Sequence, residues 1–161
     1  KVRYFNENKP LGTAGSLNNI KKKIKKNDYF FLINGDVYTE VNFKKMMNFA
    51  KKNNFDLVIG YIEKKHKSSF GILNIKDNKV KYIKEKPNNY FNINSGIYII
   101  KNTKNLNFIP KNKFFTMPNL IKKYLSKGLN IGAYNIKDYW VGIENVDNLK
   151  KVGTRLNKKS I

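Results

Sequence analysis

Cysteine is absent from the 161-residue chain, and His66 is its only histidine. Their scarcity excludes disulfides, thiolate metal sites and histidine clusters, so any bound metal must be held by oxygen. The sequence has no apolar run near the roughly 20 residues that a membrane span needs, and it does not open like a signal peptide. We therefore expect a cytoplasmic protein with no membrane partner, folded as one domain with a sizeable core.

Acidic residues and arginine are also scarce. The chain has 11 Asp and Glu against 33 Lys and Arg, a net charge of +22, and only Arg3 and Arg155 are arginine. Arginine is the residue preferred for bidentate recognition of phosphates and bases. Lysine and asparagine are spread over nearly every segment, as an AT-rich coding sequence would produce. We expect the charge to attract small anionic ligands rather than a specific nucleic acid. The alternative is polyanion binding, which predicts tight, steeply salt-dependent DNA binding.

Apolar runs of strand length alternate with segments of helical periodicity. This pattern predicts an α/β fold: a Rossmann-like, mostly parallel sheet flanked by helices, with an inserted β-hairpin that turns at Asp77-Asn78. The expected strands cover residues 2–5, 28–36, 55–62, 93–101 and 129–136, the hairpin covers 70–85, and the expected helices cover 15–27, 43–50, 117–125 and 146–152.

Two short motifs are candidates for binding a ligand or a metal ion. Gly12-Thr13-Ala14-Gly15 enters a predicted helix, where it could contact an anion or nucleotide through its backbone, or simply cap the helix. Asn34-Gly35-Asp36 follows a buried strand, at the edge of the sheet where ligands of such folds bind. Asp36 could hold Mg²⁺ through a carboxylate oxygen or close an Asx turn. Taken alone, the pair Glu85-Lys86 reads as solvated surface.

The order and spacing of six motifs make the functional interpretation of the sequence more specific. From Lys9 to Val152 it contains PLGTAGSL, FFLINGDVYTE, FGILNIKDNKVKYIKEKP, NINSGIYII, FIPKNKFFTMPNLIKKYLSKG and YWVGIENVDNLKKV. Together they resemble the sugar-1-phosphate nucleotidyltransferases, in particular their guanylyltransferase-like branch. The resemblance implies that a nucleotide sugar, expected to be GDP-linked, and pyrophosphate form from a nucleoside triphosphate and a sugar 1-phosphate. Catalysis would rest on positioning and on charge neutralisation by Mg²⁺ and basic groups.

The resemblance also implies roles for particular residues. Asp36 and Lys86 would be catalytic, with Asp36 as the Mg²⁺ ligand and Lys86 near the sugar phosphate. Asn94 and Gly96 could instead mark a strand-edge bulge. The nucleotide base and ribose would contact Leu11, Gly12, Thr13, Ala14 and Gly15, and the sugar would contact Gly71, Glu85, Lys86, Asn94 and Gly96.

Two departures from the family pattern affect these expectations. The family's opening Gly-rich loop, which cradles the triphosphate, should lie upstream of Lys9, so residues 1–161 read as a partial nucleotidyltransferase domain with an exposed sheet edge and little turnover alone. Copies of the chain could pair through that edge.

Gly142 stands where the family has a second metal-binding aspartate, and Asp138, Glu144 or Asp147 could substitute. A non-catalytic relic, or a module that binds nucleotide sugars, therefore stays an alternative. The sugar itself is not predicted.

Overall fold

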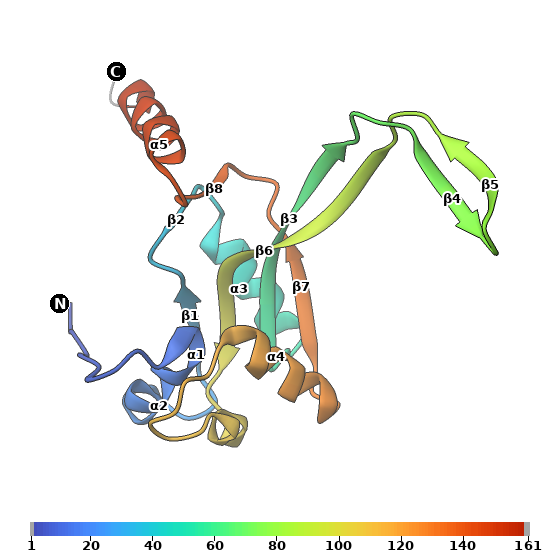
Figure 1. Ribbon diagram of the computed structural model, residues 1–161. Helices are drawn as coiled ribbons and strands as arrows, with labels where there is room; N and C mark the ends of the chain where they lie inside the picture. The colour runs from blue at the N-terminus through green and yellow to red at the C-terminus, as the bar shows by residue number, and fades with distance from the viewer. Residues whose placement is uncertain (1, 160–161) are drawn as a thin grey trace.

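The computed structural model describes residues 2–159, and Figure 1 follows its elements along the chain. The helical elements are α1 (Gly12–Gly15), α2 (Leu17–Ile20), η1 (Lys21–Lys23), α3 (Phe43–Lys52), η2 (Lys104–Phe108), α4 (Met117–Ser126) and α5 (Val146–Lys159). The strands are β1 (Tyr29–Ile33), β2 (Val37–Thr39), β3 (Leu57–Lys67), β4 (Ile72–Lys76), β5 (Lys79–Lys84), β6 (Asn88–Lys101), β7 (Ile131–Asn135) and β8 (Trp140–Gly142).

The central sheet has the strand order β1-β6-β3-β7. Strands β1, β3 and β7 run in one direction, and β6 runs in the opposite direction between β1 and β3. The predicted α/β class, with a central sheet flanked by helices, is confirmed. The predicted parallel pairing needs a correction, because the inserted β6 makes both of its own ladders antiparallel and leaves β3–β7 as the parallel one.

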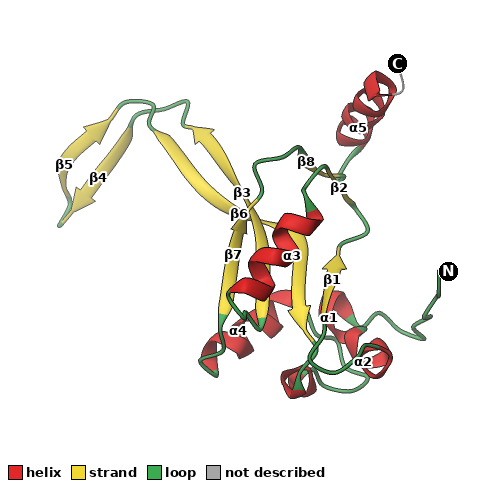
Figure 2. Cartoon of the chain, turned by 180° about the vertical axis from the view of Figure 1, so that it is seen from behind, coloured by secondary structure: helices red, strands yellow, loops and turns green. Residues whose placement is uncertain are grey.

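Helices cover both faces of the sheet: α4 lies in front of it in Figure 1, and α3 lies in front of it in the reverse view of Figure 2. Strand β6 explains why both faces need cover. Its side chains alternate, so that Tyr98 and Ile100 pack with Tyr124 of α4, whereas Ile97 and Ile99 pack on the α3 side. All four of these β6 side chains are buried, and burying each aliphatic one contributes roughly 1.5–3 kcal/mol.

Beyond the sheet, β3 and β6 continue as a two-stranded ribbon that carries the β4–β5 hairpin away from the body (Figure 1). Asp77 and Asn78 both have positive φ, 51° and 59°, as a two-residue hairpin turn of the mirror-image type requires. The predicted hairpin is therefore confirmed. Every residue of β4 and β5 is exposed.

Two local predictions were wrong. Residues 2–5 form no strand, because no partner strand lies beside them in the described part of the chain, and Val2 and Tyr4 are largely exposed. The helix expected over residues 15–27 is broken into α1, α2 and η1 and ends at Lys23. The N–H groups of Ala14 and Gly15, which have no acceptor inside a helix that begins at Gly12, bond to the distant Phe115 carbonyl.

The outer edge of β1 has no strand partner within residues 2–159, as the exposed-edge prediction requires. Over the same residues no helix is both long and apolar enough to cross a membrane.

Candidate functional site

The glycine-rich turn at Gly12–Gly15 is built against a segment about a hundred residues later. The Phe115 carbonyl accepts hydrogen bonds from the N–H groups of Ala14 (3.0 Å) and Gly15 (2.9 Å), and the N–H of Phe115 donates to the Leu11 carbonyl (2.8 Å). Gly12 has a φ of +76°, and a Cβ there would lie 2.9 Å from the Phe115 oxygen. The small residues therefore permit this backbone-to-backbone packing. Of the four N–H groups in the turn, those of Gly12 and Thr13 do not bond to Phe115.

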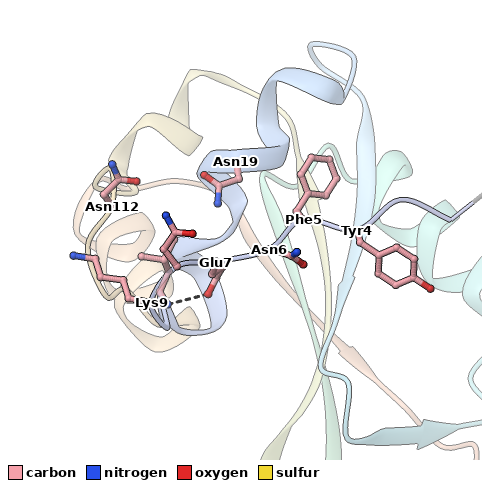
Figure 3. A pocket seen from close by; sticks show the side chains of 9 residues that line it. Tyr4, Phe5, Asn6, Glu7, Lys9, Asn19 and Asn112 are labelled. Carbon is pink, nitrogen blue, oxygen red and sulfur yellow. Dashed lines mark hydrogen bonds between the residues drawn. The ribbon is translucent and has the colours of Figure 1, made fainter.

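A cavity of about 660 Å³ opens beside this turn (Figure 3). Its walls combine aromatic rings, amides, a lysine and one carboxylate, from Tyr4, Phe5, Asn6, Glu7, Asn8, Lys9, Leu11, Asn19 and Asn112. Glu7 accepts a hydrogen bond from the Leu11 N–H through Oε2 at 3.0 Å, the dashed line of Figure 3, which holds its carboxylate at the cavity wall. Of the predicted nucleotide residues, Leu11 lines this cavity, whereas Gly12, Thr13, Ala14 and Gly15 are not among its lining residues. Ala14 and Gly15 are buried.

Asp36 lies at the turn between β1 and β2, where its side chain is exposed. Its carbonyl accepts a hydrogen bond from the Ile143 N–H at 2.7 Å, and the next residue, Val37, pairs with Gly142 across the β2–β8 ladder. The structure therefore brings Asp36 next to the glycine at which the sequence departs from its resemblance.

Asn94 and Gly96 form a structural turn in β6. The Asn94 Oδ1 accepts from the Gly96 N–H (3.0 Å) and its Nδ2 donates to the Tyr98 hydroxyl (2.8 Å). Gly96 has a φ of +73°, and a Cβ there would lie 2.9 Å from the Asn34 Nδ2. Burial raises the pKa of Tyr98, against the lowering effect of its bond to Asn94. The β3–β6 register shifts beside this turn. The bulge that was predicted as the alternative role of Asn94 and Gly96 is therefore present.

Gly71, Glu85 and Lys86 meet at the elbow between the ribbon and the hairpin. A Cβ on Gly71 would lie 2.9 Å from the Glu85 Oε2, so the Glu85 side chain lies over this glycine. The Lys86 Nζ and Glu85 Oε1 are 4.0 Å apart, and both side chains are largely exposed. Such a pair stabilises the fold little.

The predicted sugar residues thus fall into two groups. Asn94 and Gly96 lie near the sheet and Asp36, whereas Gly71, Glu85 and Lys86 lie beyond the far end of the ribbon. Six residues of extended strand separate Asn94 from Asn88, which corresponds to about 20 Å. The chain does not bring the two groups together in this arrangement.

Trp140 and Lys64 line a cavity together with Gly142. The Trp140 Nε1 donates to the Ser95 carbonyl at 2.8 Å, which fixes the indole beside the β6 turn, and the Lys64 Nζ lies 5.7 Å from the indole centroid. Neither residue was predicted as a site residue, although Trp140 lies in one of the six motifs. Trp140 could have been found as the only tryptophan in the chain, but nothing distinguished Lys64 from the other lysines.

Mg²⁺ is the cofactor that the resemblance implies. Whether it fits beside Asp36 depends on the side chains there that could coordinate it. Gly142 contributes no side chain, and within residues 2–159 no three His, Asp or Glu side chains gather closely enough to hold a metal. Mg²⁺ is usually bound through one or two carboxylates, with water and substrate phosphates completing its shell. The residues present fit a single-carboxylate site at Asp36.

Comparison with known proteins identifies the family. The family model described as nucleotidyl transferase matches residues 1–159. The chain belongs to this family. The resemblance drawn from the six motifs is therefore confirmed, and guanylyltransferases are among the relatives of this nucleotidyl transferase chain.

Three relatives illustrate the range of the match. The mannose-1-phosphate guanyltransferase of Yarrowia lipolytica is 34% identical over 104 residues, covering 62% of this chain and 29% of that protein. The glucose-1-phosphate adenylyltransferase of Clostridium novyi is 28% identical over 152 residues, covering 86% and 40%. The crystal structure of HddC from Yersinia pseudotuberculosis complexed with GMP-PN has a TM-score of 0.66 and 29% identity, covering 93% and 64%. The chain thus spans less than a third of the Yarrowia relative.

Proposed function

We propose that residues 1–161 carry substrate subsites of an enzyme that makes a GDP-sugar and pyrophosphate from GTP and a sugar 1-phosphate. The observation that carries the proposal is the cavity beside the Leu11–Gly15 turn, whose wall includes both the Glu7 carboxylate and aromatic rings. Aromatic side chains stack on nucleobases. The family membership and the HddC complex with GMP-PN support a nucleotide as the ligand.

Glu7 gives a chemical reason for choosing guanine. A carboxylate only accepts hydrogen bonds, and Glu7 spends part of this capacity on the Leu11 N–H, which leaves Oε1 for a ligand. Guanine presents two adjacent donors, N1–H and the exocyclic amino group, along the edge where adenine has an acceptor at N1. A carboxylate therefore attracts guanine and repels the adenine ring nitrogen.

The reaction itself needs no protein nucleophile. An oxygen of the sugar 1-phosphate attacks the α-phosphorus of GTP, the bond between the α-phosphorus and the oxygen bridging to the β-phosphate breaks, and pyrophosphate leaves with that electron pair. Mg²⁺, when bound, would neutralise charge on the phosphates. The chain's own residues bind and orient: Leu11 and Glu7 hold the nucleoside, Lys9 adds a cation to the same cavity, and Asp36 is the carboxylate available to the metal.

Substitution of Glu7 tests the proposal. We expect the chain to bind GTP in preference to ATP by calorimetry, and Glu7→Gln to weaken GTP binding about 10- to 100-fold, since hydrogen bonds to charged groups contribute roughly 1.5–3 kcal/mol. ATP binding should not weaken, because the amide removes the repulsion between the carboxylate and the adenine ring nitrogen. Asp77→Asn is the matched control, because it removes the same charge at the exposed hairpin turn. Equal affinity for GTP and ATP, or a Glu7→Gln variant as selective as the parent chain, would contradict the proposal.

Gly142 favours a second candidate, a module that binds a nucleotide sugar without turnover. The residue opposite Val37 has no carboxylate to add to Asp36, so metal binding there rests on one side chain. Introducing a carboxylate in Gly142→Asp should strengthen Mn²⁺ binding measured by electron paramagnetic resonance. If sugar-1-phosphate-dependent pyrophosphate release is absent in the parent chain and stays absent in this variant despite stronger Mn²⁺ binding, the binding module is favoured.

A further inference from the structure

The β4–β5 hairpin has two faces of different chemistry. Residues directly opposite each other in an antiparallel ladder lie on the same face, and Leu73 pairs with Ile83 while Ile75 pairs with Val80. These four side chains form what we call the aliphatic face. The opposite face is mixed and cationic, and it carries Ile72, Asn74, Tyr82 and the lysines at positions 76, 79 and 84.

No other part of the described chain covers the aliphatic face. Its four side chains are between 50% and 61% exposed, and neither core cluster of the described residues includes a residue of the hairpin. Figures 1 and 2 both show the hairpin standing away from the central sheet. A two-stranded hairpin on its own is marginally stable in water, and a contiguous exposed apolar patch is typical of a surface that contacts a partner.

Charge and area argue against a second copy of the chain as that partner. Each copy carries a net charge of +22, which opposes the association of like-charged copies. Two aliphatic faces would bring together eight side chains of roughly 100 Å² each, and this falls short of the about 1,200 Å² that specific protein interfaces bury.

An anionic surface fits the hairpin better. Residues 70–86 contain five lysines against two acidic residues, and a cluster of lysines is attracted to anionic lipid headgroups. The aliphatic face itself carries no charged residue, so it can leave water without burying a charge.

We propose that the aliphatic face of the β4–β5 hairpin docks on an anionic lipid bilayer. Leu73, Ile75, Val80 and Ile83 enter the boundary between headgroups and acyl chains, as the apolar side of an interfacial amphipathic segment does. The lysine side chains have apolar stems, which let their ammonium groups stay among the anionic headgroups.

The edges of the hairpin set how deep it lies. Within residues 2–159 the outer edges of β4 and β5 have no strand partner, and unpaired backbone N–H and C=O groups are not tolerated against the hydrocarbon core of a bilayer. The hairpin therefore stays in the headgroup layer. The expectation of no membrane partner rested on the lack of a spanning segment, which a surface contact of this kind does not need.

Vesicle binding tests the contact. The parent chain should bind vesicles of equal parts phosphatidylcholine and phosphatidylglycerol, and should bind pure phosphatidylcholine vesicles at least about tenfold more weakly. Ile75→Thr should lower the partition coefficient on the anionic vesicles about tenfold, because it removes an aliphatic side chain from the docking face. Ile72→Thr is the matched control: it makes the same substitution on the opposite face of β4, and it should change the coefficient less than about twofold.

Tryptophan substitutions report which face enters the lipid. The emission of Ile75→Trp should shift to the blue on the anionic vesicles and should be quenched by brominated lipid. Ile72→Trp should show neither effect beyond the response of Trp140 in the parent chain.

The two threonine variants have the same charge as the parent chain, so they separate docking from the general attraction of a cationic protein to anionic vesicles. If both bind the anionic vesicles as well as the parent does, or if both tryptophan variants are quenched alike, only net charge attracts the chain and the docking face is overturned. If the parent chain instead sediments as a dimer that Ile75→Thr dissociates, while vesicle binding is unaffected, the face belongs to a second copy and the lipid contact is overturned. GTP takes no part in these measurements, so the proposed function is tested separately.

Discussion

Substitution of Gly12 by alanine probes the contact on which the nucleotide turn depends. Two costs can be worked from the structure. An L-residue held at a φ of +76° is destabilised by about 1–2 kcal/mol. The added Cβ would also lie 2.9 Å from the Phe115 carbonyl oxygen, a backbone atom that cannot rotate away. The turn must then separate from residues 113–117.

That separation weakens two hydrogen bonds, from the N–H groups of Ala14 and Gly15 to the Phe115 carbonyl. Each contributes roughly 1 kcal/mol net. We therefore expect Gly12→Ala to lower the free energy of unfolding in urea by about 2–4 kcal/mol, with an unchanged slope against denaturant.

Gly153→Ala is the control of opposite sign. Gly153 lies inside α5, and a Cβ there would meet nothing within 4 Å, so alanine should stabilise the helix by about 0.5–1 kcal/mol. If Gly12→Ala lost less than about 0.5 kcal/mol, the close contact between the turn and Phe115 would not be present in solution, and the structural explanation of the glycines would be refuted.

Two further predictions concern the core and α5. The buried Tyr124 hydroxyl has no hydrogen-bond partner in the described part of the chain, so Tyr124→Phe should raise the free energy of unfolding at pH 7 by about 1 kcal/mol. Burial, reinforced by the charge of Asp56, raises the Tyr124 pKa. The stability that comes from the neutral phenol is therefore complete below the unfolded tyrosine pKa of about 10 and is lost as the pH rises above it. Urea unfolding between pH 9 and 11 should show a smaller loss of unfolding free energy for the phenylalanine variant than for the parent chain. Arg155 bonds Glu40 through Nε (2.6 Å) and Nη2 (2.8 Å), and Arg155→Lys, which cannot form this fork, should speed amide hydrogen exchange in α5 but not in α4; equal exchange in α5 of both proteins would count against this anchor.

Local chemistry explains which features were predictable. The hairpin turn at Asp77-Asn78 depends on two residues that tolerate positive φ, and the central strands depend on continuous apolar runs, so both could be recognised from short stretches. The glycine turn and Asp36 could also be picked out from the sequence, because each lies within a short motif. The packing of the glycine turn on Phe115 could not be predicted, since its hydrogen-bond partner lies about a hundred residues along the chain.

The candidate site shows the same division between local and long-range effects. By itself, the sequence determined the α/β class, the hairpin and the positions of the motif residues, because propensity, periodicity and turn chemistry act over a few residues. Only the tertiary structure decided that β6 enters between β1 and β3, that Glu7 faces a cavity beside Leu11, and that Lys64 meets Trp140. These contacts depend on which segments lie side by side after folding, and packing and backbone pairing across the whole chain set that arrangement.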